Sequence, residues 1–325
     1  MLLGLPEPAL VAVVAYGVTA LLFAAGQWRA AVLARRGAPR ATANREPPSV
    51  AAPARVVFLG DVQRGVREVA GPVVDVVRAE GASLLVSGGD LASHGEAPYH
   101  GIVGAAFDRA GLAVPFLVVP GNHDLEPSGR DTDLAAGRAL FERVVGPRRW
   151  TAHVGRLLLV GTDDAVGAVE DAELDWLERV VGAHDGPWVH VAHRPPRRML
   201  EPGTPWGSGR ERLAALFAAK PPVLAVSGHL ERDAEAVADG VRFVVNAEGG
   251  DVSGGRWRAP PGFRVLVADV SAEGAVTLRR LDLRRRLSLA TALDQLLVRL
   301  WADGRRFPGL LFAAPARALA ALLRR

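Results

Sequence analysis

Short apolar runs alternate with amphipathic stretches between residues 55 and 281, and this alternation most limits the folds open to the chain. Six runs have the length and composition of buried strands: 56–59, 84–87, 116–119, 157–160, 188–191 and 223–226. The stretches between them have helical periodicity: 64–80, 101–112, 133–145, 171–183 and 209–219. This order predicts an α/β layered fold. Three later runs, 241–246, 263–270 and 275–281, are separated by turns only and predict an antiparallel addition.

The composition fits a folded protein and removes several kinds of chemistry. Hydrophobic residues make up 49% of the 325 residues and charged residues 23%, which excludes a disordered chain. Cysteine is absent, so any metal must be bound by oxygen and imidazole. A G-x-S-x-G elbow, a Walker A sequence and a G-x-G-x-x-G motif after a strand are also missing from the sequence.

The charge is distributed unevenly along the chain. Residues 1–50 carry five Arg and two Glu, and residues 279–325 carry eleven Arg and three Asp, so the chain's net +4 hides an acidic middle of −7. An acidic centre argues against a nucleic-acid groove, and no nucleic-acid partner is predicted. Two basic ends are suited to an anionic membrane surface.

An apolar segment, residues 9–26, contains 18 residues without a charge. At about 1.5 Å per residue a helix of this length just crosses the hydrocarbon core of a bilayer. Five Arg follow the segment and none precedes it, which predicts a single-pass inner-membrane protein with its folded part in the cytoplasm. A buried core helix and an uncleaved export signal are the alternatives.

These features divide the chain into four predicted parts. They are an anchor at 1–28, a linker rich in Arg, Pro and Ala at 29–54, a folded domain at 55–283, and a basic amphipathic helical tail at 284–325. In the tail, Leu recurs at helical spacing among Arg residues, which is typical of a helix lying on an anionic leaflet. The alternative for the tail is a pair of helices packed on the folded domain.

Polar residues follow five of the predicted strands directly. The segments are Gly60 to Gln63, Gly88 to Asp90, Pro120 to Asp124, Ala192 to Pro195 and Ser227 to Glu231. Loops at the carboxyl ends of strands are where α/β sheets gather their sites. The glycines allow the backbone to turn sharply beside these side chains. We therefore expect the five segments to build one shared site.

These segments resemble the calcineurin-like metallophosphoesterase superfamily, whose pattern is D-x-H, GD, GNH[DE], a lone His and GHxH. The resemblance covers about residues 51–281, with its motifs in the family's order. It implies two mixed sheets packed as a sandwich flanked by helices. It also implies two divalent metal ions, Mn, Fe, Zn or Mg, bridged by Asp90. Asp61 would bind the first ion, and Asn122, His193 and His229 would bind the second.

The chain departs from the family pattern at the first ion only. Gln63 stands where the family has the His of D-x-H, and Glu231 stands where it has the second His of GHxH. Both residues carry an oxygen that can bind a metal, and an all-oxygen set favours Mn²⁺ or Mg²⁺ over Zn²⁺. Alternatively, Glu231 faces solvent and the first site is weak or empty.

The resemblance also implies a reaction. Two ions lower the pKa of a water that attacks phosphorus in line. His123 would protonate the leaving alkoxide, with Asp124 as its orienting partner. Arg64 and Arg194 are candidates for binding the substrate phosphate, although Arg in such loops is often a solvated surface charge. The sequence assigns His190 and His94 to packing or surface positions, and Asp163 and Asp164 to capping a turn.

The predicted function is a membrane-tethered, metal-dependent phosphoesterase acting on a mono- or diester. Two alternatives stay open. One is a catalytically impaired metal- or phosphate-binding regulatory module at the membrane, because the first ion's ligands are altered. The other is a hydrolase of a lipid phosphate or pyrophosphate, because the basic tail would place the site near head groups.

Overall fold

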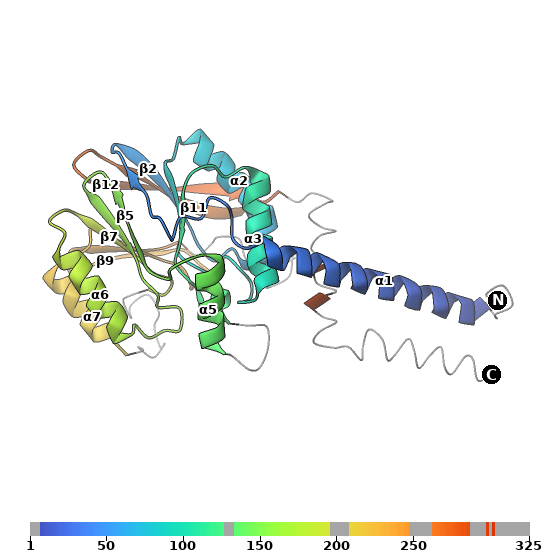
Figure 1. Cartoon of the computed structure of the whole chain (residues 1–325). Coiled ribbons are helices and arrows are strands. Elements are labelled where there is room, and N and C mark those ends of the chain that lie inside the picture. Colours follow the sequence, from blue (N-terminus) through green and yellow to red (C-terminus); the bar gives the residue numbers. More distant parts are fainter. Residues whose placement is uncertain are drawn as a thin grey trace. The chain divides into compact units, whose positions relative to one another are not determined.

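The computed structural model describes residues 7–126, 133–195, 208–246, 262–286, 297–298 and 301–302, with side chains from residue 14 onward (Figure 1). The chain divides into two units. One unit is Arg36–Arg286, and the other combines Met1–Arg35 with Leu287–Arg325. The larger unit contains both sheets.

The first sheet has five strands in the order β12-β11-β2-β3-β4. Its strands β2 (Ala54–Leu59), β3 (Leu84–Ser87) and β4 (Phe116–Val118) run parallel. The later strands β11 (Gly262–Val270) and β12 (Val276–Arg284) add to them in antiparallel fashion. The three parallel strands end at the same edge of this sheet.

The second sheet has seven strands in the order β1-β5-β6-β7-β8-β10-β9. Its parallel centre consists of β6 (Leu157–Gly161), β7 (Trp188–Val191), β8 (Leu224–Ser227) and β10 (Val241–Val245). The antiparallel additions are β5 (Trp150–Val154) and β9 (Ala234–Ala238), and the short β1 (Ser49–Val50) lies parallel to β5.

The core lies between the two sheets. Alternate residues of β2 and β3, such as Val56, Phe58, Leu84 and Val86, contribute to one buried apolar cluster together with residues of β5 to β8. Alternation is what the pleat of a strand requires, because successive side chains point to opposite faces. The remaining strand residues face the helices, which is why these runs are apolar without a break.

Helices cover both sheets. α6 (Asp171–Gly182) and α7 (Arg210–Ala219) lie together in Figure 1, and their Leu177 and Phe217 join the outward-facing residues of β6, β7 and β10 in a second apolar cluster. α2 (Val66–Ala79) and α3 (Ala97–Ala110) pack against each other and belong to the five-stranded side. The remaining helices in the described part of this unit are η2 (Gln63–Gly65), α4 (Asn122–Leu125) and α5 (Leu134–Val144).

The predicted sandwich of two mixed sheets with flanking helices is confirmed. One detail differs: 241–246, 263–270 and 275–281 do not form one antiparallel addition. β10 lies parallel to β8 in the seven-stranded sheet, whereas β11 and β12 extend the five-stranded sheet. The sequence showed no helix between these runs, but the segment after β10, residues 247–261, lies outside the described residues.

The residues predicted as a linker, 29–54, make ordered contacts. Residues up to Arg36 continue the N-terminal helix. Further along, Ala43 N donates to Phe116 O at 2.9 Å, and β1 pairs with β5. Pro and Ala content alone suggested a free linker, but these backbone groups complete sheet edges. The four predicted domain boundaries stay predictions.

The N-terminal helix α1 (Glu7–Arg36) contains the candidate membrane span. Val14–Arg36 has a mean hydropathy of 1.3 in its most apolar window, and 17% of that window is buried, so its side chains are mainly exposed. Length and composition of this kind also suit a signal sequence or a core helix. Most of the predicted tail at 284–325 lies outside the described residues; within it, Val298 and Trp301 are buried.

Candidate metal centre

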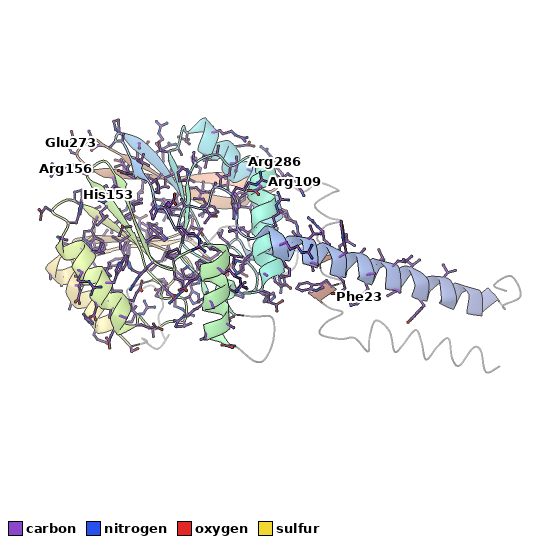
Figure 2. The ribbon with its side chains drawn as sticks, viewed as in Figure 1. Phe23, Arg109, His153, Arg156, Glu273 and Arg286 are labelled. Carbon is purple, nitrogen blue, oxygen red and sulfur yellow. The ribbon has the colours of Figure 1, made fainter. Side chains whose placement is uncertain are left out.

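The carboxyl ends of five strands bring their following residues to one edge of the sandwich. Asp61 follows β2, Asp90 follows β3, Asn122 begins α4 after β4, His193 follows β7, and His229 follows β8. The opposite edge carries the turns labelled by Arg156, between β5 and β6, and Glu273, between β11 and β12 (Figure 2). The five segments singled out in the sequence therefore meet, as the topology of parallel strands requires.

Asp61, Asp90 and His193 form the centre of this group. Each offers a ligand atom that lies within 4.8 Å of the other two, and all three side chains are buried. Asp61 Oδ2 accepts a hydrogen bond from His229 N at 2.8 Å. Asp61 Oδ1 is buried without a hydrogen-bond partner in the described part of the chain. A buried carboxylate oxygen left unpaired is costly, so a cation is the partner that its surroundings suit.

Asn122, His193 and His229 lie on one side of this centre. Asn122 Oδ1 is 3.1 Å from His193 Nε2 and 3.1 Å from His229 Nδ1, and the two ring nitrogens are 3.2 Å apart. His193 Nδ1 lies 2.9 Å from Gly88 O, and a carbonyl can only accept, so Nδ1 carries the proton. His193 Nε2 is then the atom with a free lone pair, which is the arrangement that a metal-binding histidine needs.

The electrostatics of the centre also favour a cation. Burial raises the pKa of Asp61 well above its ordinary value, and repulsion from Asp90 and Glu231 raises it further. Burial and the nearby Asp124 likewise raise the pKa of Asp90 well above its usual range. Burial lowers the pKa of His193 well below its usual range, which keeps the imidazole neutral. A divalent ion would relieve the repulsion between these buried carboxylates, and a neutral imidazole can offer its lone pair to such an ion.

The backbone around these residues is built for close approach. A Cβ on Gly121 would come within 2.0 Å of Asp90 Oδ1, and a Cβ on Gly228 would come within 2.5 Å of Asp61 Oδ2. Asp61, Asp90 and His229 have φ values of +50°, +53° and +74°. Such left-handed conformations are disfavoured for residues other than glycine and cluster at functional sites. The donor set, the unpaired oxygen and this cradle fit a divalent metal.

Gln63 and Glu231 reach the centre, but not as the sequence suggested. Gln63 Nε2 donates to Glu231 Oε1 at 2.8 Å and to Asp90 Oδ2 at 3.2 Å. The amide nitrogen, and not the oxygen, therefore faces the carboxylates. Gln63 is buried, whereas Glu231 is exposed, and both have positive φ values, +41° and +51°. Their predicted role as metal ligands stays a prediction.

His123 and Asp124 lie in α4, the short helix that follows β4. His123 N donates to Asp90 Oδ1 at 2.9 Å, and its ring centroid lies 6.4 Å from that of His94. The Asp124 carboxylate accepts from Ala92 N at 2.7 Å and from Gly121 N at 2.9 Å. These bonds join the segment after β3 to the segment after β4, so the Asp124 carboxylate holds the backbone of the site. Its predicted partnership with the His123 ring stays a prediction.

The two arginines differ in their surroundings. Arg64 is exposed in η2, next to Gln63. Arg194 is half-buried, and its Nε donates to Ala165 O at 3.1 Å. Their contact with the substrate phosphate stays a prediction.

Asp164 is a residue whose importance the sequence did not reveal. Its Oδ1 accepts from His193 N at 2.9 Å and from Arg194 N at 3.0 Å, and Arg210 Nη2 lies 3.6 Å from its Oδ2. The Asp164 side chain therefore caps a loop 29 positions away and not its own turn. The sequence gave no signal for this contact. Burial raises the pKa of Asp164, and Arg210 opposes that shift.

His190 has the packing role that strand alternation predicted. Its Nε2 lies 2.9 Å from Thr162 Oγ1, and its ring packs edge-on against Phe217 with centroids 5.2 Å apart. Burial, with Arg210 nearby, lowers the pKa of His190 to about 3. His94, in contrast, is not isolated, because it lies between His123 and Tyr99, whose ring centroid is 4.9 Å away.

Comparisons with known proteins agree with this geometry. Residues 54–231 match the family model described as calcineurin-like phosphoesterase. This range is more than half of the chain and contains all five strand-end segments. No curated protein matches the sequence.

Two solved structures share the fold. A purple acid phosphatase, PPD1, from yellow lupin (Lupinus luteus) seeds aligns with a TM-score of 0.51 and 15% identity over 71% of this chain. The alignment spans only 53% of the lupin protein. GAP50, the anchor in the inner membrane complex of Plasmodium, aligns with a TM-score of 0.50 and 13% identity, over 76% of this chain and 94% of its own.

Proposed function

The chain belongs to the calcineurin-like phosphoesterase family, and from this premise we propose that it is a membrane-held phosphoesterase using two divalent ions. At the family level it is a hydrolase that acts on phosphoric esters. The observation that carries the metal dependence is the buried group of Asp61, Asp90 and His193, with Asp61 Oδ1 unpaired in the described part. The membrane, the number of ions and the residue roles belong to the proposal.

The proposed ligands divide into two sets that share Asp90. Asn122, His193 and His229 would complete one ion site, and Asp61, Gln63 and Glu231 would complete the other. The first set combines imidazole nitrogen with an amide oxygen. The second set would consist of oxygen atoms alone, and for this the Gln63 amide must turn to present its oxygen. An all-oxygen set favours a hard ion such as Mn²⁺ or Mg²⁺.

When bound, the ions would lower the pKa of a water and neutralise charge on the phosphoryl oxygens. The chain's own residues would do the rest. His123, whose backbone is fixed on Asp90 Oδ1, would hold the proton that the leaving alkoxide needs. Asp124 would keep the Asn122 loop in place through Gly121 N. Arg194 and Arg64 would bind the phosphate of the substrate.

The membrane attachment is supported by sequence and by helix length. Val14–Arg36 is long and apolar enough to span a bilayer, and five Arg follow the apolar segment. By the positive-inside rule, the catalytic domain would face the cytoplasm at the inner membrane. The substrate would be a small phosphate ester, or a lipid phosphate or pyrophosphate if the basic tail lies on the leaflet.

A second candidate function is favoured by the bond between Gln63 Nε2 and Glu231 Oε1. If this pair stays closed, the first ion cannot bind, and the protein would be a metal-binding regulatory module without turnover. GAP50 is described as an anchor, so a protein of this fold can hold an assembly.

Metal content and turnover together test the proposal. The full chain would be purified in detergent, its bound metal measured, and hydrolysis of a generic phosphodiester followed in Mn²⁺. We expect two ions per chain and turnover. His153→Ala, which changes an exposed histidine at the far end of β5, is the control and should behave as the wild type. One ion per chain with no turnover of any ester would leave the regulatory candidate in its place.

A further inference from the structure

The segment that follows α1 completes the free edge of β4. Thr42 forms a parallel bridge with Phe116. Phe116 N donates to Ala41 O at 2.8 Å, and Ala43 N donates to Phe116 O at 2.9 Å. β4 is the last strand of the five-stranded sheet, so without residues 41–44 its outer backbone groups would lack these partners.

Asn44 fixes the end of β4 from the same segment. Its side chain is buried and makes three hydrogen bonds. Nδ2 donates to Val118 O at 2.7 Å and to Pro147 O at 2.9 Å, and Oδ1 accepts from Val118 N at 2.9 Å. An amide is the side chain that can replace a missing strand here, because it offers a donor and an acceptor side by side.

Val118 is the last residue of β4, and Asn122 comes four residues later. The residues between them, together with His123 and Asp124, form what we call the Asn122 loop, residues 119–124. This loop has no room to move toward the centre, because a Cβ on Gly121 would already lie 2.0 Å from Asp90 Oδ1. Because only three residues separate Val118 from Asn122, a small displacement of Val118 would also move the oxygen of Asn122 relative to His193 and His229.

The beginning of the segment is held on α3. Arg40 N donates to Asp108 Oδ1 at 2.9 Å. A Cβ on Gly104 would come within 2.2 Å of Gly37 O, so the helix and the segment are in direct backbone contact. The segment is thus fixed at both ends, at α3 and at β4, and Asn44 is its link to the candidate metal centre.

We propose that Asn44 is a positioning residue for the metal centre and that residues 37–44 are a working part of the catalytic domain. Asn44 holds the end of β4, and β4 holds the Asn122 loop at the distance that the ion requires. The metal-binding consequence rests on the proposed function, whereas the ordering of the loop does not.

The test uses the full chain with Asn44→Ala. Loss of a residue that orients a metal ligand typically weakens metal binding 10–100-fold, so we expect the Kd for Mn²⁺ to rise about tenfold. In the metal-free protein, amide hydrogen exchange of a peptide covering 119–124 should become faster, because a loop that is no longer fixed at Val118 holds Gly121 N and His123 N less firmly on their acceptors, Asp124 and Asp90. Both are measured well below the melting temperature of the variant.

Thr42→Ala is the matched control. Thr42 lies in the same segment, and its Oγ1 is buried without a hydrogen-bond partner in the described residues. Removing it takes away no bond, so metal affinity and exchange should stay at the wild-type values.

A second variant decides the matter if Asn44→Ala does not fold. Trp150 Nε1 donates to the same Val118 O at 3.0 Å, so Trp150→Phe removes one of its bonds and keeps an aromatic ring. A smaller change of the same sign in exchange is expected. Unchanged exchange of 119–124 in either folded variant would overturn the proposal, even where the melting temperature falls. Failure of the wild type to bind Mn²⁺ would instead overturn the proposed function, because exchange is measured without metal.

Discussion

The two sides of the metal centre are built differently. On one side, which we call the ready side, the candidate ligand atoms of Asn122, His193 and His229 lie within 3.2 Å of one another, and His193 is fully buried. On the side of Gln63 and Glu231, an amide N–H closes onto two carboxylates, and Glu231 is exposed. The ready side offers lone pairs to an ion. On the other, which we call the closed side and which consists of Asp61, Gln63 and Glu231, the Gln63 amide pairs with Asp90 and Glu231, while Asp61 Oδ1 has no hydrogen-bond partner in the described part of the chain. Under the proposed function the ready side would bind an ion without rearrangement, whereas on the closed side the Gln63 amide would first have to turn away from the carboxylates.

Removing a ligand from the ready side should have the largest effect. His193→Ala and Asn122→Ala each take away a donor that nothing nearby replaces. Residues that merely orient a ligand cost 10–100-fold in affinity, so loss of the ligand itself should lower turnover by about two orders of magnitude or more. The measurement is bound metal per chain and hydrolysis of a generic phosphodiester, with circular dichroism to verify the fold.

His153→Ala again serves as the control for the loss of a histidine outside the centre. Normal turnover in His193→Ala or Asn122→Ala would remove the proposed roles of these ligands and end the contrast between the two sides.

The support of His193 gives the next largest effect. Asp164→Ala removes the oxygen that accepts from His193 N and Arg194 N, so two backbone N–H groups lose their acceptor. We expect the metal affinity of the ready side to fall 10–100-fold, as for other residues that orient ligands. Calorimetric titration with Mn²⁺ would measure it.

The matched control for Asp164 is Asp175→Ala, since Asp175 on α6 makes an exposed ion pair with Arg212 on α7. Exposed pairs contribute little, so this variant should bind as the wild type does. Equal effects of the two substitutions would show that Asp164 does not act through His193.

The sequence predicts some strands of the fold and misses others. The strands that carry the site were predictable, because they are buried on both faces and read as unbroken apolar runs. β5 and β9 were not predictable. Thr151 and His153 interrupt the apolar pattern of β5, and β9 (Ala234–Ala238) contains a charged residue and an exposed Val237. An interrupted or weakly apolar strand is formed by its neighbours and not by its own pattern.

The site follows the same rule. Asp61, Asp90, Asn122, His193 and His229 were predictable because each lies within four residues of the end of a strand, in a segment that resembles a motif of the family. Asp164 and Asn44 were not, since their partners lie 29 and 74 positions away and depend on loops that no local pattern describes. The direction of the Gln63 amide was also beyond the sequence, because it is set by the two carboxylates that the fold places beside it.

Lowering the pH should separate the two sides. Asp61 and Asp90 have raised pKa values, so they take up protons at a higher pH than ordinary carboxyl groups, and each proton opposes an ion. His193 has a lowered pKa and stays neutral. Metal affinity should fall up to about tenfold per pH unit for each competing proton. The ion proposed to bind both Asp61 and Asp90 competes with two such protons, so it should leave first. Titrations with Mn²⁺ between neutral and mildly acidic pH measure this.

In the metal-free protein, the contribution of these carboxyl groups to stability should rise as the pH falls, whereas metal affinity falls. A carboxyl group whose pKa is higher in the folded than in the unfolded state takes up its proton preferentially on the folded chain, so its contribution to the free energy of unfolding rises as the pH falls. Chelator-treated protein should therefore lose less stability on acidification than the metal-loaded protein. Parallel losses would show that the buried carboxylates do not hold the ions.

The smallest effect is expected at the closed side, and it decides whether that side binds an ion in the working protein. Glu231→Gln removes one charge from an exposed ligand position, so activity should fall several-fold and recover partly at higher Mn²⁺. Replacing Gln63 and Glu231 together with His removes the amide N–H that closes the site and introduces imidazoles, so metal preference should shift toward Zn²⁺. Metal content measured beside turnover distinguishes the cases. If the wild type binds two ions and Glu231→Gln binds one, the closed side opens in the working protein. If the wild type binds one ion, has no turnover and is unchanged by Glu231→Gln, the amide keeps that side shut, and the double His variant should then gain the second ion.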